Sequence, residues 1–388
     1  MSEEQELQPA VPVIGKDEEA EMTLTYRRRA FPYVTQGSVY AFALQEDMAP
    51  PAIPPGGSAI RALAAVDEGI AYGLTAGARG HLFYFHPAFG VVHVGTLGEG
   101  AVEGGALARA GAREIVGGWW EEGGGGLFRH DTARELGLGS EQYRGTVTPI
   151  EPLSLPKEGE GVMALAYHPA NGVTYGLTRP GGWLVVLPAG AEAAEVVGQV
   201  EGAAPVLVTL PDGRLLGAAA EGQLWAYDPD DGTLRALGAY APCQTGKRYA
   251  AGVQSLLVSA EGLVYGGTST DGYLFSFDPE SGAVVNLGKP NRQSNIVALA
   301  EAHDGLLFGM VGEQGALAHL FRFDPDTRGF TDLGVLSSTY LAFWILHQAA
   351  CMAVGAFGEI FVGETEPISH LFVYSPPQRG ESRVARHE

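Results

Sequence analysis

The chain has 388 residues, 46% of them apolar, and its 45 acidic and 24 basic side chains give a formal net charge of −21. Such a surface repels nucleic-acid phosphates and anionic membranes, so neither is an expected partner. The two cysteines, Cys243 and Cys351, are too few for a disulfide framework, and no Cys/His spacing matches a structural zinc site.

The two ends of the chain are polar. Residues 1–21 are acidic, and we predict that they form a disordered tail; residues 378–388 form a second polar tail. The N-terminus lacks the basic segment and apolar core of a signal peptide, and no run of about 18 apolar residues occurs. The chain as given is therefore expected to be cytoplasmic.

Between the tails, residues 22–377 repeat one sequence unit. The first motif of the unit is an aromatic or aliphatic residue followed by glycine. It occurs at Tyr72-Gly73, Val116-Gly117, Tyr175-Gly176, Leu216-Gly217, Tyr265-Gly266, Phe308-Gly309 and Val362-Gly363. The second motif of the unit reads HLFYFHP at 81–87, QLWAYDP at 223–229, YLFSFDP at 273–279, HLFRFDP at 319–325 and HLFVYSP at 370–376. A period of about 40 to 60 residues with several short strands per unit is typical of a β-propeller blade.

Each unit is expected to contain four strands. In residues 253–288, alternating apolar segments are separated by Gly, Asp and Pro turns, including an Asp-Pro-x-x-Gly hairpin. Applying this template to the whole chain predicts seven blades, at 59–98, 101–155, 160–200, 203–238, 253–288, 295–334 and 349–376.

The last unit has only three strands before Pro376. The segment 37–44, GSVYAFAL, is the natural donor of the missing strand, because it would cover the open edge of that blade. The sequence therefore predicts an all-β fold: a seven-bladed β-propeller of four-stranded antiparallel blades, closed by an N-terminal strand.

Two loops that lead into innermost strands oppose the charge of the chain. One carries Lys247 and Arg248, the next carries Lys289 and Arg292, and neither contains an acid. Neighbouring blades should bring them together as a pocket for an anion, since arginine grips carboxylates with paired hydrogen bonds. Three further polar residues would complete the pocket: Tyr249, Gln293 and Asn295. The alternative is that these are solvated loop residues.

Comparing the repeats separates the histidines that recur at one position from those that do not. His81, His319 and His370 each open the third strand of a blade, and this recurrence favours a structural role. His347 precedes an innermost strand and has no counterpart, with Tyr340 and Trp344 close in sequence. It is the first candidate for a general base, and a histidine that fills the core or the channel is the alternative.

The second unit departs most from the template. Trp119 and Trp120 are expected in the loop between its second and third strands, where they would stack on sugar rings together with Tyr143 and Arg144. Packing against a neighbouring blade is the alternative for the tryptophans. Arg179, in the equivalent loop of the next unit, would add positive potential.

The chain resembles the seven-bladed propellers, including the WD40-like and Kelch-like groups. Its aromatic loop and basic pocket resemble those of the propeller polysaccharide lyases, which act on uronic-acid polymers such as ulvan or rhamnose–glucuronate glycans. That resemblance implies β-elimination without a cofactor or metal, on an anionic carbohydrate. Arg248 or Arg292, with Gln293 or Asn295, would neutralise the carboxylate, His347 would remove the proton, and Tyr249 or Tyr143 would protonate the leaving oxygen.

Two other classes of function fit the same features. One is a non-catalytic propeller that binds a protein or a glycan through its face. The other is a metal-dependent, lactonase-like hydrolase, which would need acidic residues at the channel mouth. The sequence makes no prediction about the oligomeric state.

Overall fold

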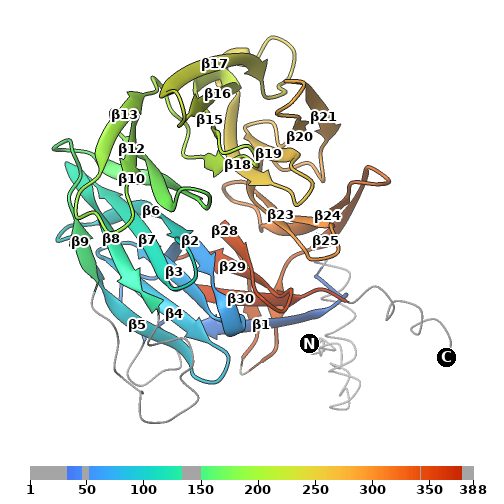
Figure 1. Ribbon diagram of the computed structural model, residues 1–388. Helices are drawn as coiled ribbons and strands as arrows, with labels where there is room; N and C mark the ends of the chain where they lie inside the picture. Colours follow the sequence, from blue (N-terminus) through green and yellow to red (C-terminus); the bar gives the residue numbers. More distant parts are fainter. Residues whose placement is uncertain (1–32, 46–51, 133–149, 341, 378–388) are drawn as a thin grey trace, which may run out of the picture.

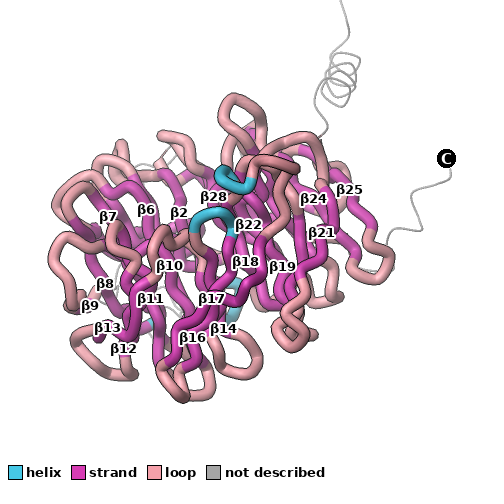
Figure 2. The backbone as a smooth tube through the Cα atoms, turned by 90° about the horizontal axis from the view of Figure 1, so that it is seen from above, coloured by secondary structure: helices cyan, strands magenta, loops and turns pink. Residues whose placement is uncertain are grey.

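The computed structural model describes residues 33–45, 52–132, 150–340 and 342–377. Within them, seven four-stranded antiparallel sheets stand in a ring around a central channel (Figure 1), which confirms the predicted all-β seven-bladed propeller. Helix in this part of the chain is limited to single 3-10 turns, and none is long enough to cross a membrane (Figure 2). The tails expected at 1–21 and 378–388 lie outside the described residues.

The blades follow one another along the chain, each with its first strand innermost. Blade 1 contains β2 (Ala59–Ala65), β3 (Ala71–Ala76), β4 (Gly80–His86) and β5 (Gly90–Leu97). Blade 2 contains β6 (Val102–Arg109), β7 (Glu114–Glu121), β8 (Gly124–Asp131) and β9 (Glu151–Leu153). Blade 3 contains β10 (Gly161–His168), β11 (Val173–Arg179), β12 (Trp183–Leu187) and β13 (Glu195–Gln199).

The second half of the ring repeats this order. Blade 4 contains β14 (Leu207–Thr209), β15 (Leu215–Ala218), β16 (Gln223–Asp228) and β17 (Thr233–Tyr240). Blade 5 contains β18 (Gly252–Val258), β19 (Val264–Ser269), β20 (Leu274–Phe277) and β21 (Val284–Gly288). Blade 6 contains β22 (Asn295–Glu301), β23 (Leu307–Gly312), β24 (His319–Asp324) and β25 (Gly329–Gly334).

Blade 7 is built from both ends of the chain. It contains β28 (Ala349–Val354), β29 (Ile360–Glu364), β30 (His370–Ser375) and, as its outer strand, β1 (Ser38–Ala43). β1 pairs with β30 in antiparallel register from Ser38 opposite Ser375 to Ala43 opposite His370. Figure 1 shows this blue strand alongside the red β30. The predicted closure by an N-terminal strand is confirmed.

The repeated glycine of the second strand is explained by an aromatic ring on the third. The two residues face each other in five blades of the described chain: Gly73–Phe83, Gly117–Phe128, Gly217–Trp225, Gly266–Phe275 and Gly309–Phe321. A Cβ on Gly266 would lie 2.2 Å from Cζ of Phe275, so the ring occupies the space that any side chain would need.

Blade 7 differs from the expected repeat by one residue. Val362, and not Gly363, lies opposite the aromatic Phe372. Gly363 instead faces the neighbouring blade, where a Cβ would lie 2.6 Å from Cγ2 of Ile60. Aligning the repeats on this glycine alone therefore places blade 7 one residue out of register. Its glycine makes room for the neighbouring blade, and not for an aromatic ring of the same blade.

The Asp of the second motif stabilises the hairpin turn between the third and fourth strands. A side-chain oxygen of Asp228, Asp278 or Asp324 accepts the N–H of the residue two positions later. His86 stands at this position in blade 1, and its Nδ1 accepts the N–H of Ala88 at 3.0 Å. The imidazole thus replaces the carboxylate in the same turn.

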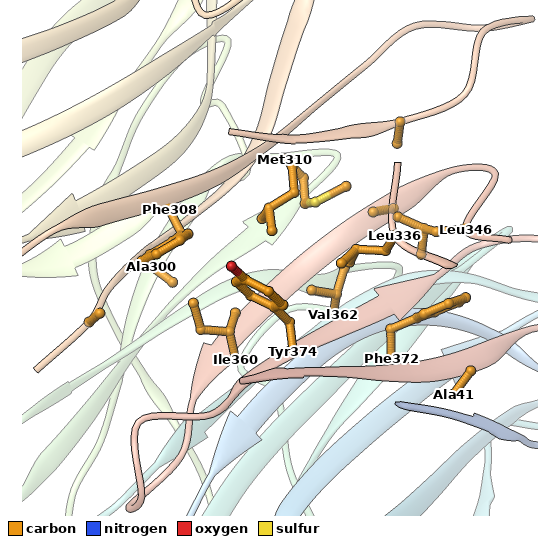
Figure 3. Close-up of a cluster of buried hydrophobic side chains, with 14 residues drawn as sticks. Ala41, Ala300, Phe308, Met310, Leu336, Leu346, Ile360, Val362, Phe372 and Tyr374 are labelled. Carbon is orange, nitrogen blue, oxygen red and sulfur yellow. The ribbon is translucent and has the colours of Figure 1, made fainter. Parts of the chain in front are cut away.

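The segment between blades 6 and 7 is packed into the closing seam of the ring. Figure 3 shows the cluster formed by Phe308 and Met310 of β23, Ile360 and Val362 of β29, Phe372 and Tyr374 of β30, and Leu336 and Leu346 of this segment. A short hairpin of β26 (Ser337–Ser338) and β27 (Trp344–Ile345) lies between the two leucines. Tyr340 at its tip meets Tyr40 of β1 edge to face, with ring centroids 5.6 Å apart.

We predict that Gly266→Ala destabilises the fold by about 2 kcal/mol, because the new methyl group overlaps the Phe275 ring. Gly176→Ala is the matched control: it occupies the same strand position, but its Cβ would lie 3.1 Å from Cγ2 of Val185. It should cost less than about 1 kcal/mol, since alanine also loses less entropy than glycine on folding. Urea unfolding measures both. Equal losses would contradict the role given to the ring.

Candidate functional site

The first strand of six blades in the described chain carries a β-bulge at the same place. At each bulge one residue is skipped in the pairing with the second strand: Arg61, Glu103, Met163, Gln254, Val297 and Ala350. A bulge re-aims the side chain of the extra residue. Arg61, Met163, Gln254 and Val297 consequently line the channel or its mouth.

The channel opens into a cavity of about 530 Å³ on the face formed by the loops that enter innermost strands. Its wall mixes polar and apolar groups, and the polar ones include the side-chain amides of Gln254, Asn295, Gln314 and Gln348. Arg61 is the one Lys or Arg among the described residues that line it, and Glu313 and Glu366 are its acids. We call this the channel-mouth cavity.

The Arg61 guanidinium has no protein partner in the described part of the chain: no hydrogen bond or ion pair to it occurs there, and the side chain is exposed to the cavity. Cys351 lies near it in the channel wall. Burial raises the pKa of the Cys351 thiol to about 12, and the charge of Arg61 opposes this only in part. The thiol therefore stays protonated near neutral pH and is a poor nucleophile.

His347 lies where the sequence predicts, just before the innermost strand β28. Its backbone is held on both sides: its N–H donates to Oε1 of Glu364 at 3.1 Å, and its carbonyl accepts from Ala318 at 2.8 Å. The side chain is exposed and lines the channel-mouth cavity. The structure thus brings together His347 and Asn295 from the predicted set, with Arg61 as the cation.

Amide side chains support the rim of the cavity. Nε2 of Gln293 donates to the carbonyl of Leu317 at 2.7 Å, and Nε2 of Gln348 donates to the carbonyls of Glu313 and Ala316. These bonds hold the loop between β23 and β24 over the mouth. Oε1 of Gln293 is buried with no partner. The amide nitrogen of Gln293 is thus bound to the loop, and its contact with a ligand stays a prediction.

The four predicted cations do not line the channel-mouth cavity. Nη1 of Arg248 donates to the carbonyls of Glu221 and Ala241, at 3.2 and 2.6 Å. Nζ of Lys289 lies 4.7 Å from the centre of the Tyr273 ring. Lys247 and Arg292 are exposed.

The two basic loops are neighbours, but a turn of blade 5 separates them. Thr270 donates its hydroxyl to the carbonyl of Ala250 in the first loop, at 3.1 Å, and its N–H to Oδ1 of Asn295 beyond the second, at 2.9 Å. Tyr249 lies in η5 (Arg248–Ala250) with 78% of its surface exposed. The predicted pocket between the loops is not among the cavities seen here, so its role as an anion site stays a prediction.

The expected loop position of Trp119 and Trp120 is wrong: both belong to strand β7. They pair with Gly126 and Gly125 of β8, and a Cβ on Gly126 would lie 2.2 Å from the Trp119 ring. The glycine run therefore forms a strand, because its missing side chains make room for an indole. Trp119 packs on Phe128 of its own blade, with ring centroids 6.3 Å apart, and against the buried cluster that includes Tyr72 and Leu74 of blade 1, in line with the alternative of packing against a neighbouring blade.

Arg179 ends strand β11 and does not lie in a loop. Its guanidinium carbon is 3.8 Å from the centre of the Trp120 ring, which joins blades 2 and 3 by a cation–π contact. Tyr143 and Arg144 lie outside the described residues. Tyr340 packs on β1, and Trp344 lies over His370 with ring centroids 4.2 Å apart.

Sequence reasoning missed a buried acid–base pair in blade 7. At the end of the second strand, blades 1, 3 and 5 carry Thr75, Thr178 and Thr268, whose hydroxyls accept the N–H of the residue that opens the third strand. Blade 7 has Glu364 in this position. Its Oε2 accepts from the backbone N–H of His370 at 3.0 Å and lies 2.7 Å from Nδ1 of the same residue.

The three histidines that open third strands thus have different surroundings. His81 lies 3.2 Å from His93 in blade 1, His319 pairs with the partly exposed Asp332, and His370 pairs with Glu364, which is only 2% exposed. The sequence predicted a shared structural role because these histidines recur at one place in the repeat. In the structure they share their position in the strand, but their side chains have different partners. Among the described residues, no group of three or more His, Cys, Asp or Glu side chains is arranged to hold a metal ion.

Comparison with known proteins finds the fold but no close relative. No family model matches the chain, and no curated protein matches its sequence. Virginiamycin B lyase from Staphylococcus aureus has a similar structure, with a TM-score of 0.64 and 10% identity over 87% of this chain and 99% of that one. A catalytically inactive histidine-to-alanine variant of it with quinupristin gives 0.62 and 11%, over 87% and 100%.

The extracellular domain of a one-component system from B. thetaiotaomicron is also similar, with a TM-score of 0.57 and 14% identity over 87% of this chain. The match covers only 40% of that domain. At such identities the likeness shows the propeller fold alone. The finer resemblance to polysaccharide lyases remains a hypothesis.

We predict that acid destabilises the protein through His81. Burial, with the nearby His93 and Arg79, lowers the pKa of His81 from 6.5 to about 4. Between these values the unfolded chain binds a proton that the folded protein excludes, so stability falls as the pH drops through this window. The free energy of unfolding should fall by up to about 3 kcal/mol across this window.

His81→Gln should therefore reduce the loss of stability between about pH 7 and pH 4, measured by chemical denaturation. Glutamine suits the position because Gln223 opens the third strand of blade 4. His303→Gln, at an exposed turn, is the control and should leave the pH dependence unchanged. The same slope in both variants would show that His81 is not the titrating group.

Proposed function

We propose that the channel-mouth cavity binds an acidic carbohydrate through the carboxylate of a uronic-acid residue. The observation that carries this is Arg61, a cation without a protein partner in the described chain that lines this cavity in a protein of net charge −21. An arginine held in a concave site favours a carboxylate, which it can bind with two parallel hydrogen bonds.

The rest of the cavity suits a sugar better than an apolar ligand. Its volume of about 530 Å³ lies in the usual range for small-molecule sites. The amides of Gln254 and Asn295 offer donors and acceptors for hydroxyl groups, and Oε1 of Gln348 offers an acceptor. Glu313 and Glu366 on the rim disfavour a ligand with several closely spaced anionic groups, which supports one carboxylate per binding unit.

Arg61→Gln should weaken binding of a glucuronate or galacturonate oligosaccharide by at least about tenfold, because a charged hydrogen-bond pair is lost. Isothermal titration calorimetry measures this. Arg248→Gln is the matched control, since its guanidinium is bound to backbone carbonyls away from the cavity, and it should bind as the native protein does. Equal binding of a neutral glucose oligosaccharide, or full binding by Arg61→Gln, would reject the proposal.

A second candidate function is β-elimination at the same cavity. It is favoured by the exposed His347 imidazole, which lines the cavity together with Arg61. With the carboxylate on Arg61, the adjacent C–H becomes more acidic, and His347 would take that proton as the C–O bond to the leaving sugar breaks and a carbon–carbon double bond forms. Water would protonate the departing oxygen, since none of the described residues that line this cavity is a tyrosine.

If elimination occurs, uronate oligosaccharides should yield an unsaturated product, followed by its ultraviolet absorbance. His347→Ala should lower that rate by at least about a hundredfold while the binding affinity measured by calorimetry stays within about threefold. Absence of an unsaturated product from a ligand that binds would leave the protein as a non-catalytic, carbohydrate-binding propeller.

The cytoplasmic location expected from the sequence stays a proposal.

A further inference from the structure

A second cavity, of about 480 Å³, lies beside the channel mouth and has a different chemical character. Its wall is apolar, made by Phe343, Trp344, Ile345, Pro367 and Ile368. Phe343 and Ile368 are 38% and 44% exposed, so these large apolar side chains present part of their surface to the cavity. We call this the Trp344 cavity. It shares only His347 and Glu366 with the channel-mouth cavity.

The Glu364–His370 pair forms part of its lining. Glu364 accepts three N–H groups, from the backbone of His347, the backbone of His370 and Nδ1 of His370. A carboxylate that accepts at both oxygens has no proton to give, so the Nδ1 of His370 carries the hydrogen. A ring that carries this one hydrogen presents Nε2 as an acceptor.

Nε2 of His370 is buried and has no hydrogen-bond partner. The whole residue is only 5% exposed, and Trp344 lies over its ring. A buried acceptor without a partner is costly, so such atoms in native proteins call for an explanation. A ligand that supplies a donor would satisfy this nitrogen.

Blade 6 provides a comparison within the same molecule. His319 opens β24 as His370 opens β30, and its Nδ1 also meets a carboxylate, Asp332, at 3.0 Å. The His319 and Asp332 side chains are 18% and 34% exposed, against 6% and 2% for His370 and Glu364. His319 does not line the Trp344 cavity. Of these two histidine–carboxylate pairs, only the pair of blade 7 is buried beside an apolar wall.

We propose that the Trp344 cavity is a binding site for a small molecule with an apolar ring and one O–H donor, of the phenol class. The ring would pack against Trp344, Phe343 and Ile368, and the hydroxyl would donate to Nε2 of His370. Glu364 and Glu366 repel a carboxylate or phosphate at this point. The contacts proposed for this ligand use neither Arg61 nor His347, the two side chains assigned to the carbohydrate at the channel mouth.

The test compares p-cresol with toluene, which has the same ring but no donor. Binding is measured by titration calorimetry and by the ¹⁵N chemical shift of His370 Nε2. The native protein should bind p-cresol about tenfold more tightly than toluene, the value of one hydrogen bond to a buried acceptor. p-Cresol, and not toluene, should shift the Nε2 resonance.

His370→Phe should remove the preference for p-cresol and keep binding of both rings, since phenylalanine fills the space of the imidazole. His319→Phe is the matched control and should keep the tenfold preference. Equal affinity of the two compounds for the native protein, or p-cresol binding without a change at Nε2, would overturn the proposal. The chemical-shift measurement needs no variant, so it decides the question even if His370→Phe does not fold.

Discussion

The closure of the ring is the constraint on which the rest of this structure depends. Each blade covers the next, and the seventh is complete only when β1 pairs with β30. The segment that enters blade 7 is packed into this seam through Leu336 and Leu346, and Tyr340 contacts β1. His347 follows directly, so the candidate general base is positioned by the closure itself.

The fold could be read from the sequence because its signals are local and repeated. A glycine is required opposite Phe275, and a side-chain acceptor is required after the third strand, as at Asp278. Each such requirement recurs in most blades, so chance variation at one position does not hide it. Even the exception His86 was recognisable, since its imidazole accepts the same N–H.

The site was harder to predict because it depends on features that repeat with one residue changed. Arg61 stands at a bulge position that carries Gln254 in another blade, and aligning the innermost strands on Ile60 and its equivalents would have exposed it. Glu364 was hidden by the one-residue offset at Gly363. The basic loops misled for another reason: side-chain hydrogen bonds, such as those of Arg248, direct a cation to backbone carbonyls, and sequence position does not show this.

The strand that closes blade 7 also fixes an order of events. β1 leaves the ribosome before any of the blades, while its partner β30 is made after all of them. Until β30 has been made, β1 has no strand to pair with, and the long separation between the two strands makes their pairing slow. The growing chain therefore passes through an open ring with an unpaired strand edge, the kind of edge to which a strand of another copy can add.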